Sequence, residues 1–157
     1  MKTLFEILPQ VGRLDWIGLR PERMGNLQAV TEAVVIAERG LQGDHKVSGR
    51  AGSKRQVTLI QSEHLVAVAG LLHRDRVAPE LARRNLAVSG INLLALKGKQ
   101  FQVGTVLFEF SGPCEPCSRM EFILGPGGFN AMRGHGGITA KVIEGGTIRL
   151  GDEVRIA

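Results

Sequence analysis

Two cysteines stand three residues apart in the segment Gly112-Pro113-Cys114-Glu115-Pro116-Cys117-Ser118-Arg119, and the chain contains no others. With only two thiols among 157 residues, disulfides cannot form the framework of the fold. The two prolines favour a loop, and Arg119 places a positive charge beside the thiols. Because thiolates are nucleophiles and ligands of soft metals, this segment is the first candidate for chemistry.

Four interpretations of Cys114 and Cys117 stay open from these residues alone. Free cysteines are often buried as small apolar side chains, although prolines and charges surround these two. A zinc site needs four ligands and would have to recruit two histidines at no recognised spacing. Cys-x-Pro-Cys is also a redox spacing, but that motif normally opens a helix within a βαβ unit, which we do not predict here. The fourth interpretation is a thiolate that binds a soft metal or carries sulfur.

Two basic segments could hold an anion. Arg83-Arg84-Asn85 lies between a short helix and a predicted strand. Two guanidiniums and an amide there can bind a phosphate through paired hydrogen bonds, although a solvated helix end is an equally good interpretation. Residues 49–55 end in Lys54 and Arg55 before another strand, but they lack the glycine-to-Gly-Lys-Ser/Thr spacing of a P-loop.

Two glycine-containing segments are further candidates. In residues 40–46 a glycine turn presents Asp44 and His45, and a histidine can transfer protons near neutral pH. An ordinary Gly-Asp turn is the alternative. Residues 125–137 include Arg133 and His135 among many glycines. This segment is predicted to be a mobile lid or a cradle for a ligand.

Short strands separated by glycine turns dominate the pattern and are predicted at residues 31–37, 56–60, 86–88, 101–103, 106–110, 138–143, 148–150 and 154–156. One helix is predicted from an N-cap at Ser62 to about Leu72. This order indicates a mainly β protein, an antiparallel barrel or sandwich with a few short helices. A doubly wound sheet is disfavoured because the strands do not alternate with long helices. We expect a single domain over residues 1–157.

Composition excludes several classes of function. At 43% hydrophobic residues the chain can bury a core, and its net charge of +5 favours an anionic partner. One Trp, six Phe and no Tyr are too few for nucleic-acid binding by stacking. No apolar run reaches the roughly 18 to 20 residues of a membrane span, and the first ten residues lack a signal-type core. We therefore expect a cytoplasmic protein with free thiols.

Taken in order, these segments resemble the MOSC family, named after the C-terminal domain of molybdenum cofactor sulfurase. Each piece is weak alone, but the ordered set is specific and runs from about Thr31 to Val154. It comprises Gly-Leu-Gln-Gly-Asp at 40–44, Arg-Gln-Val at 55–57, Arg-Asn-Leu at 84–86 with Val88 and Gly90, Pro116-Cys117, and Ala140-x-Val142-x-x-Gly145-Gly146-x-Ile148-x-x-Gly151-Asp152-x-Val154.

The resemblance implies a barrel-like domain and one family cysteine, which aligns with Cys117; Cys114 lies outside the minimal pattern. In related enzymes that reduce amidoximes, this cysteine ligates molybdenum of the pterin cofactor. In the sulfurase it is proposed to carry sulfur from a pyridoxal-phosphate enzyme. Stand-alone bacterial members are associated with detoxifying N-hydroxylated bases. By this resemblance Cys117 is the metal ligand or persulfide, and Asp44 and His45 shape the pocket or move protons. The residues expected to bind the anionic cofactor are Arg84, Asn85, Arg55, Lys54, Arg119, Arg133 and His135.

The sequence departs from the larger relatives in two ways. It shows neither the lysine-bearing pyridoxal-phosphate domain of the sulfurase nor the additional N-terminal β domain of the molybdenum-ligating relatives. We therefore expect a reductase of N-hydroxylated compounds supplied by a separate electron donor. The alternative is a sulfur carrier supplied by a separate cysteine desulfurase. A dithiol redox protein built on Cys114 and Cys117 is the third hypothesis.

Overall fold

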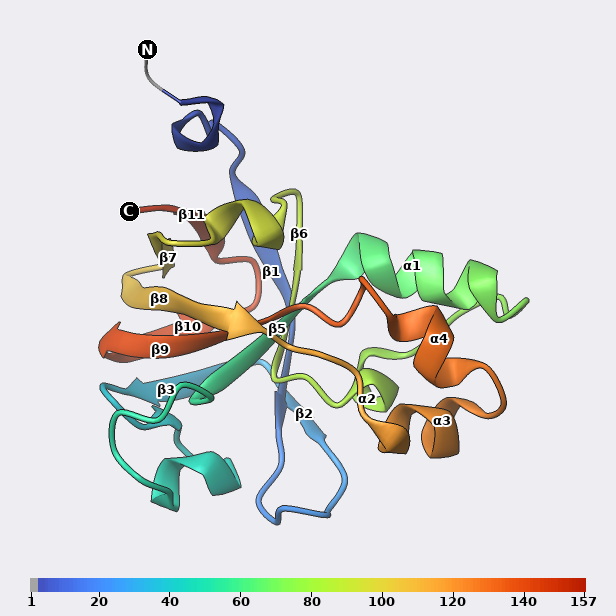
Figure 1. The fold of residues 1–157 in the computed structure, drawn as a ribbon. Coiled ribbons are helices and arrows are strands. Elements are labelled where there is room, and N and C mark those ends of the chain that lie inside the picture. The colour runs from blue at the N-terminus through green and yellow to red at the C-terminus, as the bar shows by residue number, and fades with distance from the viewer. Residues whose placement is uncertain (1–2) are drawn as a thin grey trace.

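In the computed structural model, which describes residues 3–157, seven strands close into a barrel and four short helices gather on one side of it (Figure 1). The barrel strands are β1 (Gly12–Leu19), β5 (Val57–Gln61), β6 (Leu86–Ser89), β7 (Gln100–Val103), β8 (Val106–Pro113), β9 (Ile138–Glu144) and β11 (Glu153–Ile156). The helices are α1 (Ser62–Leu71), α2 (Pro79–Ala82), α3 (Ser118–Leu124) and α4 (Gly128–Met132). The strands pair in the order β11-β7-β8-β9-β5-β6-β1, and β11 pairs with β1 to close the barrel.

The remaining elements lie around the barrel. The strands outside it are β2 (Gln28–Val30), β3 (Glu32–Ile36), β4 (Gly40–Leu41) and β10 (Gly146–Arg149). Strand β2 extends the main sheet beyond β1, and the other three form a small sheet in the order β10-β3-β4. The 3₁₀ turns are η1 (Leu4–Glu6), η2 (His45–Ser48) and η3 (Leu93–Leu96). None of the helices in residues 3–157 combines the length and the apolar character needed to cross a membrane.

Two apolar clusters hold these layers together. The first fills the barrel, where the rings of Phe101 and Phe108 stack with their centroids 5.5 Å apart. The second joins the outer face of β5 and β6 to the helices, through residues such as Ile60, Val68 and Met120. Burial of apolar surface on both sides of these two strands explains why β5 is buried along its whole length.

The mainly β barrel with short helices is confirmed, but the expectation of purely antiparallel strands is wrong. Strands β5 and β6 are parallel and are joined through α1 and α2, which makes a βαβ unit. A parallel pair needs a long crossover, and the second part of this crossover is a four-residue helix too short to be recognised from periodicity. Strand β1 was also missed because its apolar residues do not alternate regularly: its burial pattern changes at Trp16–Gly18, after a register shift.

Several boundaries differ from the prediction. Strand β8 continues to Pro113 rather than ending at Phe110, so it leads directly into the cysteine segment. Ser62 is the first helical residue of α1 rather than its N-cap, and its hydroxyl donates to Asp15 Oδ2 at 2.7 Å. Residues 125–137 do not form an open loop, since they contain α4.

The end of this glycine-rich segment packs closely against the barrel. Gly137 has a φ of +88°, and a Cβ at this position would lie 1.9 Å from the carbonyl oxygen of Leu59. Gly134 has a similar φ of +80°, but a Cβ there would meet nothing within 4 Å. Of these two positions, Gly137 therefore requires glycine for lack of space as well as for its backbone conformation, whereas Gly134 requires it for its backbone conformation alone.

Gly137→Ala is expected to destabilise the protein much more than Gly134→Ala. The left-handed conformation alone costs an alanine about 1 to 2 kcal/mol, and Gly137→Ala adds a clash with backbone. Urea unfolding should show a loss at least about 2 kcal/mol larger for Gly137→Ala. Equal losses in the two variants would contradict the close packing of Gly137.

Candidate functional site

The cysteine segment, residues 114–117, connects the end of β8 to the start of α3. Cys117 is exposed, whereas Cys114 is 2% exposed and its backbone N–H donates to the carbonyl of Gly137 at 2.9 Å. Both thiols are free. The two cysteines therefore have different environments, and Cys117 is the one that an external molecule can reach.

The buried side chain of Arg84 donates hydrogen bonds to the backbone of the cysteine segment. It is only 6% exposed. Its Nε donates to Gly136 O at 2.8 Å, its Nη1 to Ala82 O at 3.0 Å, and its Nη2 to Cys114 O at 3.2 Å and Glu115 O at 3.4 Å. Because carbonyl groups occupy all three guanidinium nitrogens, Arg84 is a support for the loops rather than an open anion-binding group.

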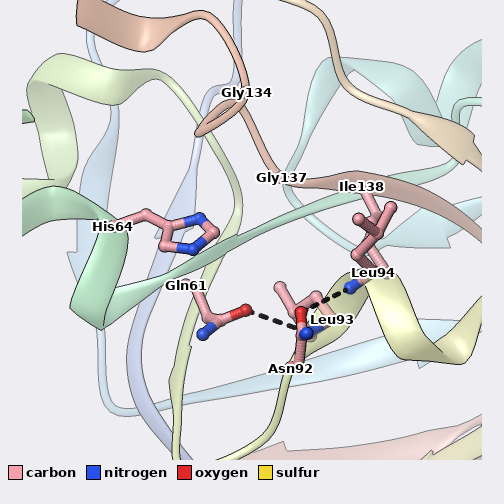
Figure 2. A pocket seen from close by; sticks show the side chains of 8 residues that line it. All are labelled: Gln61, His64, Asn92, Leu93, Leu94, Gly134, Gly137 and Ile138. Carbon is pink, nitrogen blue, oxygen red and sulfur yellow. Dashed lines mark hydrogen bonds between the residues drawn. The ribbon is translucent and has the colours of Figure 1, made fainter. Parts of the chain in front are cut away.

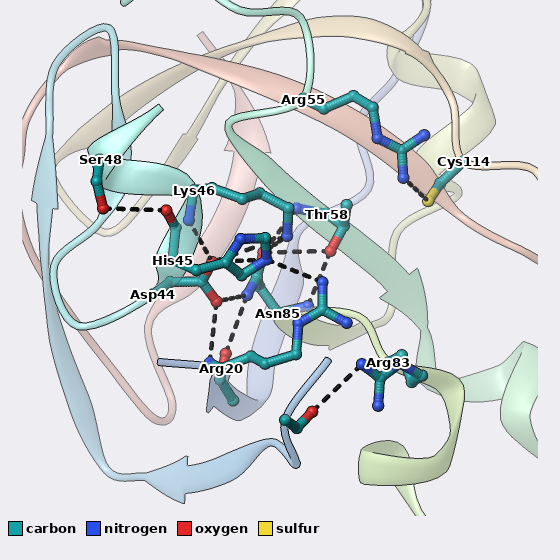
Figure 3. A network of polar contacts seen from close by, with 12 residues as sticks. Arg20, Asp44, His45, Lys46, Ser48, Arg55, Thr58, Arg83, Asn85 and Cys114 are labelled. Carbon is teal, nitrogen blue, oxygen red and sulfur yellow. Dashed lines mark hydrogen bonds and ion pairs between the residues drawn. The ribbon is translucent and has the colours of Figure 1, made fainter. Parts of the chain in front are cut away.

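Asp44 and Asn85 form a buried polar network beside this support (Figure 3). Asn85 Nδ2 donates to Asp44 Oδ2 at 2.9 Å and to Gly18 O at 3.1 Å, while its Oδ1 accepts from Thr58 N at 3.2 Å. Asp44 Oδ2 also accepts from Arg20 N at 3.0 Å. The network joins η2, β5 and the start of β6 to the end of β1. Both side chains therefore position these elements.

His45 and Arg20 contact each other at the rim of this network. Arg20 Nη2 lies 3.0 Å from His45 Nε2, and since a guanidinium can only donate, Nε2 is the acceptor. Burial lowers the pKa of His45, Asp44 opposes that shift, and Lys46 and Arg20 add to it. His45 is consequently neutral at pH 7, and its Nε2 is already engaged.

Lys46 extends into the same network. Its side chain is 14% exposed, and its Nζ donates to Asn85 Oδ1 at 3.2 Å and lies 3.9 Å from Asp44 Oδ1. Burial, opposed by Asp44, lowers the pKa of Lys46 to about 8. At pH 7 the amine is thus mostly protonated but close to the range in which it can release a proton.

Arg20, Arg83 and Arg119 form a cluster in which Arg83 lies close enough to Cys117 for the two groups to interact electrostatically. Burial lowers the pKa of Arg83, the charges of Arg20 and Arg119 lower it further, and Cys117 opposes the shift. Arg83 Nη2 donates to Gly25 O at 3.3 Å. The Nε atoms of Arg20 and Arg119 are buried, and within residues 3–157 neither has a hydrogen-bond partner. Buried donors without partners are costly and rare, so each of these two N–H groups is able to donate to a further small partner, such as water or an anion.

The other predicted basic residues are arranged differently. Arg55 is exposed, and its Nη2 lies 3.8 Å from Cys114 Sγ (Figure 3). Lys54 is also exposed, and its carbonyl accepts a hydrogen bond from Ser111. Arg55 therefore belongs to the surroundings of the buried cysteine, whereas the Lys54 side chain has no described contact with either thiol.

His135 and Arg133 lie in the C-terminal part of the glycine-rich segment, residues 125–137. The His135 ring packs edge-on against His64 with centroids 5.1 Å apart, and its Nδ1 contacts Ala131 O at 3.1 Å. His64 and Gln61 line a separate hollow of about 220 Å³ between α1, η3 and the glycine turn (Figure 2). Arg133 is exposed and contacts Asn130. The geometry groups neither residue with Cys117.

Sequence reasoning missed Arg20, Lys46 and Thr58 as members of the site. Lys46 belongs to the segment 40–46 but was not singled out, and it lies within the 3₁₀ turn η2, from which its side chain reaches the buried network. Arg20 directly follows the unpredicted strand β1, and Thr58 is an interior residue of β5. Only the pairing of β1, β5 and β6 brings these residues together.

Comparison with known proteins identifies the family. A family model described as the MOSC domain matches residues 44–155, which is more than half of the chain. The chain belongs to the MOSC family. No curated protein matches it in sequence.

Solved structures give the same fold. YuaD from Bacillus subtilis has a TM-score of 0.79 and 18% identity, over 96% of this chain and 98% of that one. YiiM from Geobacillus stearothermophilus has a TM-score of 0.74 and 19% identity, over 93% and 75% of the two chains. YiiM from Escherichia coli has a TM-score of 0.69 and 22% identity, over 92% and 69%. At these identities the likeness shows the fold alone.

Arg84→Met is expected to lower the free energy of unfolding of the ligand-free protein by roughly 2 to 4 kcal/mol, because it leaves buried carbonyls without donors. Arg119→Met is the matched control and should change the stability by no more than about 0.5 kcal/mol. Its Nε has no partner within residues 3–157, and its Nη1 has only a long, exposed contact of 3.9 Å with Met24 Sδ. Urea unfolding of both variants gives the comparison. Unchanged stability in Arg84→Met would contradict its supporting role.

The stability of the native protein should rise relative to Lys46→Met between pH 8 and 10. The folded-state pKa of about 8 lies below the unfolded value of roughly 10.4, so the unfolded state binds more protons in this interval. Raising the pH therefore favours the folded state, by up to roughly 3 kcal/mol in total. Unfolding free energies measured across this range should diverge; parallel curves for the two proteins would disprove the buried amine.

Proposed function

We propose that this MOSC protein binds an anionic molybdenum-pterin cofactor and reduces N-hydroxylated compounds, with Cys117 as the thiolate ligand of the metal. The observation that carries the proposal is the pair of buried Nε atoms on Arg20 and Arg119 that lack partners within residues 3–157, in one cluster with Arg83, which interacts with the exposed Cys117. Guanidiniums suit phosphate through charge-assisted hydrogen bonds, and a thiolate suits a soft metal. The donor set therefore fits both ends of such a cofactor.

The arginines divide into two groups in this proposal. Arg20 and Arg119 would bind the phosphate, because their buried Nε atoms lack partners within residues 3–157 and both charges lie close to Arg83, which interacts with Cys117. This role was expected for Arg84 and Asn85, but their polar atoms are engaged with protein groups, and we assign them the support of the loops.

Reduction of an N–O bond to an amine takes two electrons and two protons and releases water. The bound cofactor would supply the two-electron redox centre, and a separate electron-donor protein would supply the electrons. Lys46 Nζ is our candidate for holding one proton, since an amine with a pKa of about 8 is mostly charged at pH 7. Asp44 and His45 were expected to shape the pocket or to move protons. We assign them the first of these roles, because they fix the positions of Lys46 and Arg20.

A sulfur carrier is the second candidate function. In that case Cys117 would receive a sulfur atom as a persulfide from a separate cysteine desulfurase and pass it to an acceptor. The exposure of Cys117 favours this role as well, because both the donor and the acceptor must reach the thiol. The dithiol hypothesis has less support, since Cys114 is 2% exposed and has its own contact with Arg55.

Cys117→Ser is expected to abolish molybdenum loading, because a hydroxyl is a poor ligand for a soft metal at neutral pH. The protein should be purified from a host that makes the cofactor and analysed for metal and for pterin fluorescence. Cys114→Ser is the matched control and should retain most of the metal, provided that circular dichroism shows both variants folded.

Four outcomes separate the hypotheses. Molybdenum in the native protein and in Cys114→Ser, but not in Cys117→Ser, supports the reductase. Cyanolysable sulfur on Cys117 without molybdenum supports the sulfur carrier. Full retention of molybdenum by folded Cys117→Ser would refute the assignment of Cys117, and equal loss of reduction in both variants would favour the dithiol.

A further inference from the structure

A large apolar side chain is exposed beside the reactive cysteine. Phe122 lies on α3, the helix that follows Cys117, and is 84% exposed. One exposed apolar residue is ordinary on a protein surface. Phe122 is not isolated, however, because its neighbours form one wall of a hollow.

This α2–α3 hollow has a volume of about 280 Å³ and two kinds of lining. The apolar side chains that line it are Leu27, Leu81, Phe122 and Ile123. Arg83 and Arg119 supply the positive charges of its polar lining. Arg119 also belongs to the cluster with Arg20 and Arg83, so the hollow adjoins the proposed site.

The charges in the hollow favour one orientation of a ligand. Arg119 brings the buried Nε that has no partner within residues 3–157, and Arg83 makes one hydrogen bond, to Gly25 O. Glu80, with the neutral Asn26, completes the lining and would repel an anion. A negatively charged group must therefore face the two guanidiniums, and the apolar part of the same molecule would lie against Phe122.

We infer that the α2–α3 hollow binds an organic anion with an aromatic body, whose carboxylate is held by Arg83 and Arg119 and whose rings cover Phe122. A cavity of roughly 150 Å³ is enough for benzene, so 280 Å³ leaves room for a second ring. Sites that combine an apolar wall with a few polar groups are typical of small-molecule binding. Insofar as this inference rests on the proposed function, the hollow holds the body of the substrate and limits it to aromatic acids that carry the N-hydroxylated group. Arg119 would then contact both the cofactor's phosphate and the ligand's carboxylate, which the five N–H donors of a guanidinium allow.

The binding is tested on protein purified without cofactor, by calorimetric titration with three probes. 2-Naphthoate has both the charge and the rings, 2-naphthamide has the rings alone, and inorganic phosphate has the charge alone. We expect saturable binding of 2-naphthoate that is at least about tenfold tighter than that of 2-naphthamide, because the guanidiniums recognise the carboxylate. Equal affinities, or 2-naphthoate binding that does not saturate, would overturn the inference.

Phe122→Ser tests the apolar wall. It should weaken 2-naphthoate binding at least about fivefold and leave phosphate binding unchanged. Phe5→Ser is the matched control: Phe5 is 87% exposed and lies in η1, far from α3 (Figure 1), and this change should have no effect. Equal 2-naphthoate affinities in the two variants would overturn the inference. Because no metal is involved, failure here is distinguishable from failure of molybdenum loading.

Discussion

The hydrogen bonds of the buried Arg84 guanidinium are the constraint on which the site depends. They join the end of α2, the cysteine segment and the glycine turn at Gly136, three stretches that are far apart in the sequence. Burying a charge is costly unless its hydrogen bonds are satisfied, and here carbonyl oxygens satisfy them. Gly136 allows the close approach, since a Cβ there would lie 2.1 Å from Cys114 O. The position of Cys117 thus follows from a backbone arrangement that Arg84 stabilises.

The polar residues near Arg84 form two groups, which differ in whether their polar atoms are already hydrogen-bonded to protein groups. Asp44, Asn85 and Thr58 bind one another and the backbone, so they fix the end of β1 against β5 and β6. Arg20 and Arg119 instead each keep a buried Nε–H without a partner in residues 3–157, in one cluster with Arg83. Preorganised donors of this kind lower the cost of ordering a site when an anion binds. The proposed function and the aromatic-acid inference both rest on these unengaged atoms.

The sequence was sufficient for the mainly β barrel, most of its strands and the membership in the MOSC family, because glycine turns and short apolar runs are local signals. It was insufficient for the parallel pair β5–β6 and for β1, which depend on pairing between distant segments. The same limit applies to the site. Arg84 and Arg119 look alike in sequence, and only the carbonyls that surround one of them distinguish a support from a candidate anion-binding group. Arg20 and Lys46 carry no local signal of their roles, since burial beside Asp44 defines them.

The most direct test of this division is a nuclear magnetic resonance titration that observes the arginine Nε–H signals while inorganic phosphate is added to the cofactor-free protein. Each signal is assigned by substituting its arginine. We predict that the Nε–H signals of Arg20 and Arg119 shift with a common saturation curve as phosphate is added. The Nε–H signal of Arg84, which is bound to Gly136 O, should not shift. A shift of the Arg84 signal with Arg20 and Arg119 unchanged would contradict the account.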